Sequence, residues 1–392
     1  MTLRQFAPML LWKALQSKVD SGGRWNMATA PIGGSRLPVP VPRDGVWAVL
    51  GTTANRLWER GCFGRPIRDG IRLTTAEVLN AHRLRGLPLP HDGWLAEVLP
   101  DHPDLLFECE VLDSLRFPGE KVVLAENLNA ANAVLLDSRS WALRWSRNVK
   151  PRDAEPLAEI RWMRGSDQID WGALSEWTSN VQVGGRIPEL LIVDDEHGVV
   201  TYRCALHDPV GPLTDPFRGL DNDERRVISH AWGQSMETDG GYWLDIPRSE
   251  WPLPGIGINM ENGVWLTEIE SQIISRVVNP TMPLPTGEIA NWMAIQSDLL
   301  SRGLAVRPGF KYGTRWRVYA GLVGGEHAPW LVVPVDEAPT NWGEACLAAR
   351  LAAGVNKHWL CALEPLGNNS GWRYLALERP PSDARWTNPV RH

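Results

Sequence analysis

Side chains that could carry out acid–base chemistry gather in the last third of the chain, at Tyr319, His327 and Lys357. Cleavage of RNA without a metal needs a base near the ribose 2′-hydroxyl, an acid near the 5′ leaving oxygen and a cation beside the developing phosphorane. These residues supply one group of each kind. Taken singly, such a tyrosine is more often a packing residue, such a histidine a loop residue and such a lysine a helix cap. The sequence around them therefore decides whether they form a catalytic site.

The three residues stand in three ordered blocks, which read GFKYGTRWRVY (309–319), HAPWLV (327–332) and RLAAGVNK (350–357). This arrangement resembles the catalytic repeat of the archaeal-type tRNA-splicing endonuclease family. The resemblance implies that Tyr319 is the general base, His327 the general acid and Lys357 the group that stabilises the transition state. The products would be a 2′,3′-cyclic phosphate and a 5′-hydroxyl. The sequence leaves open whether Tyr319 and His327 exchange roles.

The same resemblance implies residues that bind RNA. Arg350 precedes Lys357 by two helical turns and is expected on the same helical face, where the family uses an arginine to clamp a bulged base. The second clamping residue is Arg379 or Trp372, and Lys311 either contacts phosphate or lies at a sheet edge. We expect no catalytic part for seven other histidines: His82, His91, His102, His197, His207, His230 and His358.

The chain also repeats itself. Residues 61–80 align with 254–273 at a constant offset, and each copy has a glycine turn, a Leu-Thr pair and a helical pattern. Thr74 and Thr267 are predicted helix N-caps, each completed by a glutamate three residues later, Glu77 and Glu270.

Further matches extend the repeat. Residues 169–206 align with 340–377, and 114–123 align loosely with 299–308, which indicates two divergent copies of one α/β unit. The first copy has Arg186-Ile187-Pro188-Glu189 near the place of Lys357, the segment 141–145 (WALRW) near that of Tyr319, and no histidine near Ala154. The first copy is therefore predicted to be catalytically silent.

We expect an α/β fold with mixed sheets, built as tandem tRNA-intron-endonuclease-like units, the C-terminal one with a restriction-endonuclease-like nuclease core. The expected divisions are a helix with a Gly/Pro-rich linker (1–42), a silent repeat (43–207), an acidic connector (208–239) and a catalytic repeat (240–392), whose core spans about 295–379.

An acidic turn, Asp194-Asp195-Glu196, lies between two predicted strands of the silent repeat. The resemblance implies that this turn inserts into a basic pocket of a second chain, and hence a homodimer with two active sites. The alternative is a solvated hairpin tip.

Composition limits the protein class. The 392 residues are 43% hydrophobic and 22% charged, and the net charge of −6 argues against a general nucleic-acid coat protein. The five cysteines are widely spaced without a CxxC pair, which fits a reducing cytoplasm and predicts neither disulfides nor zinc. No apolar run is long enough to span a membrane. The many arginines and 21 tryptophans, most of which we expect in cores, are typical of a GC-rich, actinomycete-like bacterial genome.

The sequence thus predicts a metal-independent endoribonuclease, without cofactor, that cleaves bulge-helix-bulge-like RNA such as intron-containing pre-tRNA. One alternative is an endoribonuclease with another target, such as mature or damaged tRNA. A second alternative is a non-catalytic RNA-binding paralogue. A metal-dependent DNA nuclease is disfavoured, because paired carboxylates are not evident near Lys357 and 2′-hydroxyl attack cannot operate on DNA.

Overall fold

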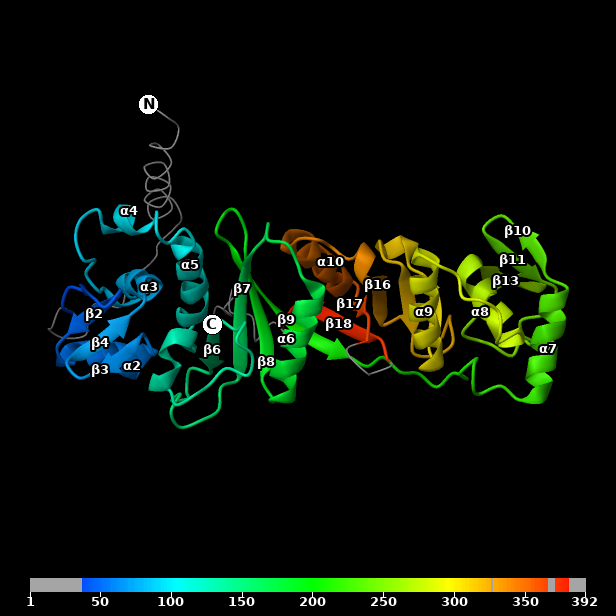
Figure 1. Ribbon diagram of the computed structural model, residues 1–392, viewed down its shortest axis with the longest axis horizontal. Helices are drawn as coiled ribbons and strands as arrows, with labels where there is room; N and C mark the ends of the chain where they lie inside the picture. Colours follow the sequence, from blue (N-terminus) through cyan, green and yellow to red (C-terminus); the bar gives the residue numbers. More distant parts are fainter. Residues whose placement is uncertain (1–36, 326, 366–370, 381–392) are drawn as a thin grey trace, which may run out of the picture. The chain divides into compact units, whose positions relative to one another are not determined.

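The computed structural model describes residues 37–325, 327–365 and 371–380. The protein is a mixed α/β structure with several sheets (Figure 1). Its contacts group into two compact units, Met1–Leu135 with Ala142–Leu157 and Leu136–Trp141 with Ala158–His392. The N-terminal helix expected from the sequence lies outside the described residues.

The first unit contains a small antiparallel sheet in the order β1-β2-β4-β3. Val41 and Pro42, which were expected in a linker, form part of edge strand β1, where a proline is tolerated. Helices α2 to α5 and the antiparallel pair β5–β6 complete the unit. The bounds are β1 Val41–Arg43, β2 Val46–Leu50, η2 Thr52–Ala54, α2 Asn55–Gly61, β3 Arg65–Ile67, β4 Gly70–Leu73, α3 Thr75–Arg85, α4 Trp94–Val98, α5 Leu105–Arg116, β5 Lys121–Leu124, η3 Ala125–Ala130 and β6 Ala142–Trp145.

The second unit is built on a mixed sheet in the order β14-β15-β16-β17-β18-β9-β8-β7. Side chains alternate between two cores along its strands, because successive residues of a strand face opposite sides. Helices α6 and α10 pack on one face, and α9 packs on the other (Figure 1). The bounds are β7 Ala158–Arg164, α6 Trp171–Val183, β8 Ile187–Val193, β9 Val199–His207, α9 Glu288–Ser301, β14 Ala305–Pro308, η4 Phe310–Tyr312, β15 Trp316–Tyr319, β16 Trp330–Pro334, η5 Val335–Glu337, α10 Trp342–Gly354, β17 His358–Leu363 and β18 Arg373–Glu378.

A second small sheet, in the order β10-β11-β13-β12, also belongs to this unit, with α7 and α8 beside it (Figure 1). Helix α7 lies within the segment expected to be a connector. Its N-cap is Asp221, and Glu224 completes a capping box, a start signal that the spacing Asp-x-x-Glu already carries in the sequence. The bounds are α7 Asn222–Gly233, β10 Met236–Thr238, β11 Gly241–Leu244, β12 Ile258–Met260, β13 Gly263–Thr267 and α8 Glu268–Val278.

The two small sheets are built alike. Each has an outer hairpin, a third strand that pairs antiparallel with it, and a helix directly after that strand. The capping boxes predicted at Thr74 and Thr267 are both present, since each threonine accepts the amide hydrogen of its glutamate, Glu77 or Glu270. This agreement is physical support for the alignment of 61–80 with 254–273.

Each capping glutamate is also buried against an arginine. Glu77 accepts hydrogen bonds from the amide of Gly64 and from Arg116, at 2.8 and 2.9 Å. In the second small sheet, Glu270 accepts from the amide of Gly257 at 2.9 Å, and Arg307 lies 3.5 Å away. The arginines come from a helix and a strand, respectively, so the two copies reach the same ion pair from different sequence positions.

The aligned segments 169–206 and 340–377 meet at strands β9 and β18. These strands pair antiparallel, and Ala205 lies opposite Ala376. In the alignment of 169–206 with 340–377, these two alanines are equivalent positions. The register is therefore symmetric about this pair, as expected when two copies of one unit join through the same edge strand.

A second seam forms between α6 and α10. Their N-caps, Asp170 and Asn341, are equivalent residues, and each accepts an amide hydrogen of its own helix. The tryptophans that follow, Trp171 and Trp342, lie with ring centroids 6.5 Å apart and are both buried. These tryptophans therefore serve the core, as predicted for most of the tryptophans.

We expect Glu270→Gln to lower the free energy of unfolding by about 3–5 kcal/mol, because it leaves the buried Arg307 without its charged partner. Denaturant unfolding together with hydrogen exchange of the α8 amides measures this loss. The matched control is Glu268→Gln, in the same first turn but exposed, which should cost less than about 1 kcal/mol. Equal losses of stability in the two variants would contradict the proposed contribution of the buried pair of Glu270 and Arg307.

Candidate active site

Tyr319, His327 and Lys357 lie at one edge of the second unit's sheet. Strand β15 ends at Tyr319, and β16 begins at Trp330, opposite Val318 in the antiparallel register. Strands β16 and β17 run parallel, and Trp330 lies level with His358. The end of β15 and the starts of β16 and β17 therefore share one edge, which carries Tyr319, the loop with His327, and Lys357.

Ala328 connects the three residues. It is buried in one small cluster with Tyr319 and Ala305, and its carbonyl oxygen accepts a hydrogen bond from Lys357 Nζ. His327 immediately precedes it in the chain and is exposed. The structure thus brings Tyr319 and Lys357 together around the residue next to His327, which leaves the imidazole in reach of solvent.

The side chains of Tyr319 and Lys357 are held differently from that of His327. Both are largely buried, with 8% and 9% exposed, so their positions are set by packing. The guanidinium of Arg317 lies 5.9 Å from the ring centroid of Tyr319.

Tyr312 is a further member of the site that was not predicted from the sequence. The ammonium of Lys357 lies 5.5 Å from its ring centroid, and that of Lys311 lies 6.0 Å from the same centroid. Lys311 itself is exposed in the short helix η4. The signal available in the sequence was the glycine-bracketed Phe-Lys-Tyr of the first block, where both flanking glycines permit a tight turn.

The expected shared helical face of Arg350 and Lys357 is wrong. Helix α10 ends at Gly354, and Asn356 takes a left-handed conformation with φ 54°. Lys357 therefore follows the helix and leads into β17, where its direction is set by the sheet. Arg350 remains on the helix and is exposed.

Arg379 and Trp372 lie at opposite ends of β18. Extended beyond the strand ends, the β17–β18 register places His358 opposite Glu378, as their hydrogen bond supports, and Lys357 opposite Arg379. Arg379 thus lies at the edge that carries Lys357. Trp372 packs against the core on the α9 side of the sheet, and its amide contacts Asp298.

The charges of Arg350 and Arg379 both affect the pKa of the Tyr202 hydroxyl and that of the Cys346 thiol. Burial raises the pKa of the Tyr202 hydroxyl, and the charges of both arginines oppose this. Burial likewise raises the pKa of the Cys346 thiol to about 11 against the same two charges. Because electrostatic effects of this kind fall off with distance, both arginines are near the contact of Tyr202 with Cys346, which joins β9 to α10.

In the first copy, the position that aligns with Lys357 is occupied by Arg186, which forms an ion pair. Arg186 directly precedes β8, as Lys357 precedes β17, and it donates to Glu159 at 2.7 Å with both side chains buried. Glu159 also accepts from Ser140 and from the amide of Leu136. The cation of this copy is thus neutralised inside the fold. Among the described residues, no carboxylate lies within ion-pair distance of Lys357.

The acidic turn joins β8 and β9, as predicted from the hairpin signal. Asp194 Oδ1 accepts the amides of Glu196 and Gly198, at 3.0 and 2.7 Å, which closes the turn. Asp194, Asp195 and Glu196 are all exposed. The structure therefore presents these carboxylates at a hairpin tip.

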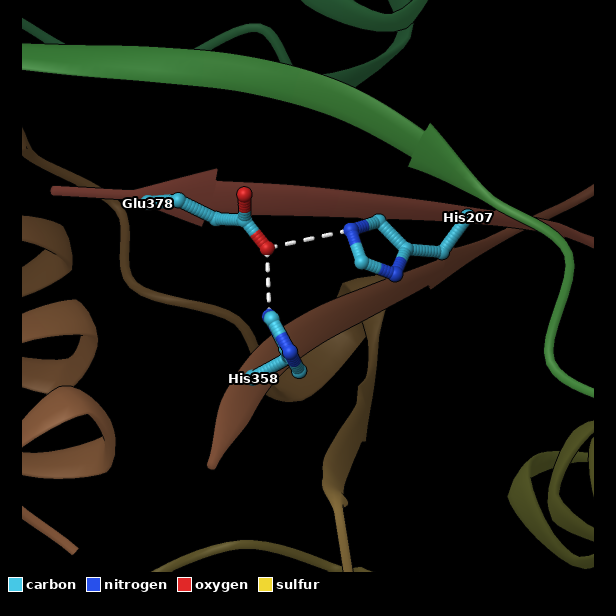
Figure 2. Close-up of side chains that lie close together, drawn as sticks. All are labelled: His207, His358 and Glu378. Carbon is cyan, nitrogen blue, oxygen red and sulfur yellow. Dashed lines mark hydrogen bonds and ion pairs between the residues drawn. The ribbon is translucent and has the colours of Figure 1, made fainter. Parts of the chain in front are cut away.

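Within the described part of the chain, one group of side chains is arranged as metal ligands are. His207, His358 and Glu378 lie on three adjacent strands, and their ligand atoms are all within 4.8 Å of one another (Figure 2). Hydrogen bonds from both imidazoles hold the pKa of Glu378 at about 2, and Glu378 raises the pKa of His358. This group includes none of Tyr319, His327 and Lys357, although His358 directly follows Lys357 in the chain.

None of the helices described in the structure is long and apolar enough to cross a membrane.

Comparison with known proteins adds to this geometry. Residues 290–371 match the tRNA intron endonuclease catalytic C-terminal domain, a range that includes Tyr319, His327 and Lys357. The chain is 23% identical to a tRNA-splicing endonuclease of Methanosarcina acetivorans over 343 residues, 82% of this chain and 94% of that protein. It is 26% identical to the corresponding protein of Picrophilus torridus over 43% of this chain and 48% of that one. It is 37% identical to that of Hyperthermus butylicus over 24% and 49%.

The C-terminal domain and the strand edge that it contains define the protein as an endonuclease. More particularly, residues 290–371 match the catalytic domain of a tRNA intron endonuclease, an RNA-cleaving enzyme, and the chain is a distant homologue of tRNA-splicing endonucleases over most of its length. A bacterial origin stays a prediction.

Proposed function

We propose that the protein cleaves bulge-helix-bulge RNA, such as intron-containing pre-tRNA, by a metal-independent attack of the ribose 2′-hydroxyl. The observation that carries the proposal is the convergence of Tyr319, Lys357 and the His327 loop at one sheet edge, inside the segment that matches the catalytic domain. The relatives' name, tRNA-splicing endonuclease, supports pre-tRNA as the substrate.

The chemistry follows from the three groups. Tyr319 removes the proton of the 2′-hydroxyl, whose oxygen then attacks the adjacent phosphorus. The bond from phosphorus to the 5′ oxygen breaks, and His327 donates the proton that this leaving oxygen requires. Lys357 lies beside the negative charge that develops on the phosphorane. The products are a 2′,3′-cyclic phosphate and a 5′-hydroxyl.

The placement of each residue fits its proposed part. The buried Tyr319 is held in place by packing at the end of its strand, and the exposed His327 lies in a loop that RNA can reach. The ammonium of Lys357 lacks a carboxylate partner among the described residues, so its charge remains available to the phosphate.

We also propose that Arg350 and Arg379 clamp an unstacked base, while Lys311 contacts phosphate. Bulged bases are recognised by stacking on planar guanidinium or aromatic groups. Arg379 is favoured over Trp372, because it shares the neighbourhood of Arg350 and lies opposite Lys357. These cations would form a local basic surface on a chain whose net charge is −6.

The tandem arrangement forms part of the same proposal. Residues 43–207 would be the silent repeat and 240–392 the catalytic one, with a restriction-endonuclease-like core at about 295–379. The buried pair of Arg186 and Glu159 supports a structural part for the first repeat. Two such chains would associate through Asp194, Asp195 and Glu196, giving a cytoplasmic homodimer with two active sites.

The alternatives differ in what they predict for RNA. An endoribonuclease with another target, such as mature or damaged tRNA, would cut that RNA by the same chemistry and leave bulge-helix-bulge RNA intact. A non-catalytic paralogue would bind structured RNA without cutting it.

In EDTA, the wild-type protein should cleave a bulge-helix-bulge RNA to the stated ends, and a substrate with a 2′-deoxy residue at the cut should resist. His327→Ala and Lys357→Ala should each slow cleavage about 10²–10⁴-fold, because each removes one transition-state interaction. Mapping of the RNA ends and single-turnover rates measure this. Cleavage that requires Mg²⁺, or that leaves a 5′-phosphate, would refute the mechanism.

The assignment of acid and base can be tested separately with a substrate whose 5′ leaving oxygen is replaced by sulfur. A thiolate leaves without a proton, so loss of the general acid should matter little for this RNA. We expect His327→Ala to recover most of its rate, and Tyr319→Phe to stay slow. The opposite pattern would exchange the two roles.

Arg350→Ala and Arg379→Ala should each weaken binding of bulged RNA and reduce the salt dependence of binding, with a loss of roughly 1–3 kcal/mol for a stacked base. Trp372→Ala is the comparison, and it should affect stability more than RNA affinity, because the tryptophan packs against the core. Filter binding at several salt concentrations distinguishes the two effects. Greater loss of affinity in Trp372→Ala would reverse the choice of clamp.

Light scattering at micromolar concentration should report a dimer for the wild type and a shift towards monomer for Asp195→Asn with Glu196→Gln. Asp194 is left unchanged because its side chain closes the turn. Asp239→Asn, in the turn between β10 and β11, is the control and should remain dimeric. A monomeric wild type would contradict the proposed use of the acidic turn.

A further inference from the structure

A histidine–glutamate cluster lies on the sheet at the junction of the two repeats (Figure 2). Glu378 Oε1 lies 3.0 Å from His207 Nε2 and 2.5 Å from His358 Nδ1. His207 ends β9, His358 begins β17, and Glu378 ends the strand between them, β18. The side chains of His207, Glu378 and His358 are 24%, 29% and 48% exposed, so solvent and ions can reach them.

The register places His358 beside Glu378, while His207, opposite Tyr374, reaches Glu378 across the central pair of Ala205 and Ala376. His358 lies opposite Glu378 when the β17–β18 pairs are continued. His207 and Glu378 occupy equivalent positions of the two repeats, each two residues beyond the central pair of Ala205 and Ala376. These two residues and the two alanines face the same side, because residues two apart in a strand do so. The alanines carry only methyl groups, which lets the longer side chains meet above them.

We propose that His207 Nε2, His358 Nδ1 and Glu378 Oε1 bind one zinc ion, with water as the fourth ligand. Imidazole nitrogen and carboxylate oxygen are both common zinc ligands, and three protein ligands with one open position are a known zinc coordination. The zinc proposal does not depend on the proposed RNA cleavage, because the zinc ligands are different residues from Tyr319, His327 and Lys357.

The geometry needs only a small adjustment. A tetrahedral ion at about 2.0–2.1 Å from each ligand atom requires those atoms to lie roughly 3.3–3.4 Å apart. The two contacts to Glu378 are 3.0 and 2.5 Å, and the imidazole nitrogens lie no more than 4.8 Å from each other. Modest opening of the glutamate contacts and rotation of the two rings would satisfy the ion. The imidazole rings already lie with centroids 5.0 Å apart.

The position of the site indicates what the ion would do. It would join β9 of the first repeat to β17 and β18 of the second, across the symmetric junction. His358 directly follows Lys357, and successive residues near a strand point to opposite faces. The ion would therefore lie on the other side of the sheet from the Lys357 ammonium. It would brace the strand that carries Lys357 without meeting the RNA phosphate.

The test uses the full chain, stripped with a chelator and titrated with Zn²⁺ against a chromophoric competitor. We expect one tightly bound zinc per chain and an unfolding midpoint that rises with zinc concentration, because an ion that binds only the folded state stabilises it. Substitution by Co²⁺ should give the visible absorption of a four-coordinate site without a thiolate charge-transfer band, which excludes binding by a cysteine such as Cys346.

Two ligand variants and one control make the assignment specific. His207→Gln and Glu378→Gln should each weaken zinc binding at least about tenfold and reduce the stabilisation by zinc accordingly. His230→Ala, which removes an exposed histidine of α7, should leave both unchanged. Circular dichroism without zinc checks that each variant is folded.

Two results would overturn the proposal. One is a folded wild-type chain that binds no zinc at micromolar concentration, which would leave the cluster as a hydrogen-bonded His–Glu–His group. The other is zinc binding that persists undiminished in both ligand variants. Neither measurement involves RNA, so failure of the zinc site and failure of the cleavage proposal are separable.

Discussion

The antiparallel pairing of β9 with β18 is the interaction on which the rest of the second unit depends. It joins the aligned segments 169–206 and 340–377 in a register centred on Ala205 and Ala376, so one sheet extends through both segments. Every backbone hydrogen bond of this seam satisfies groups that would otherwise form an exposed sheet edge. The helices α6 and α10, capped at Asp170 and Asn341, then pack side by side on one face.

The strands on the two sides of the seam have the same topology, but the cations that precede β8 and β17 have different surroundings. In the first copy, the cation before β8 is buried against Glu159, which makes it a structural ion pair. In the second copy, the cation before β17 donates to the backbone carbonyl of Ala328 and faces the ring of Tyr312. Burial with a carboxylate partner makes a charge structural, whereas a charge without one remains available to a ligand.

The two small sheets contain the same buried interaction. The capping threonine and glutamate are retained at equivalent positions, but the arginine that neutralises the glutamate comes from α5 in one copy and from β14 in the other. A buried carboxylate needs a partner wherever the chain can supply one, because an unpaired charge in the interior costs several kcal/mol.

The sequence by itself determined the local features: the capping boxes at Thr74 and Thr267, the hairpin at Asp194, and the order of the blocks with Tyr319, His327 and Lys357. These depend on residues close in the chain. Only the tertiary structure decided that Lys357 leaves the helix of Arg350, that Arg379 rather than Trp372 lies opposite it, and that Tyr312 faces it. It also brought His207 to His358 and Glu378, because contacts between distant residues follow from strand register, which no local pattern encodes.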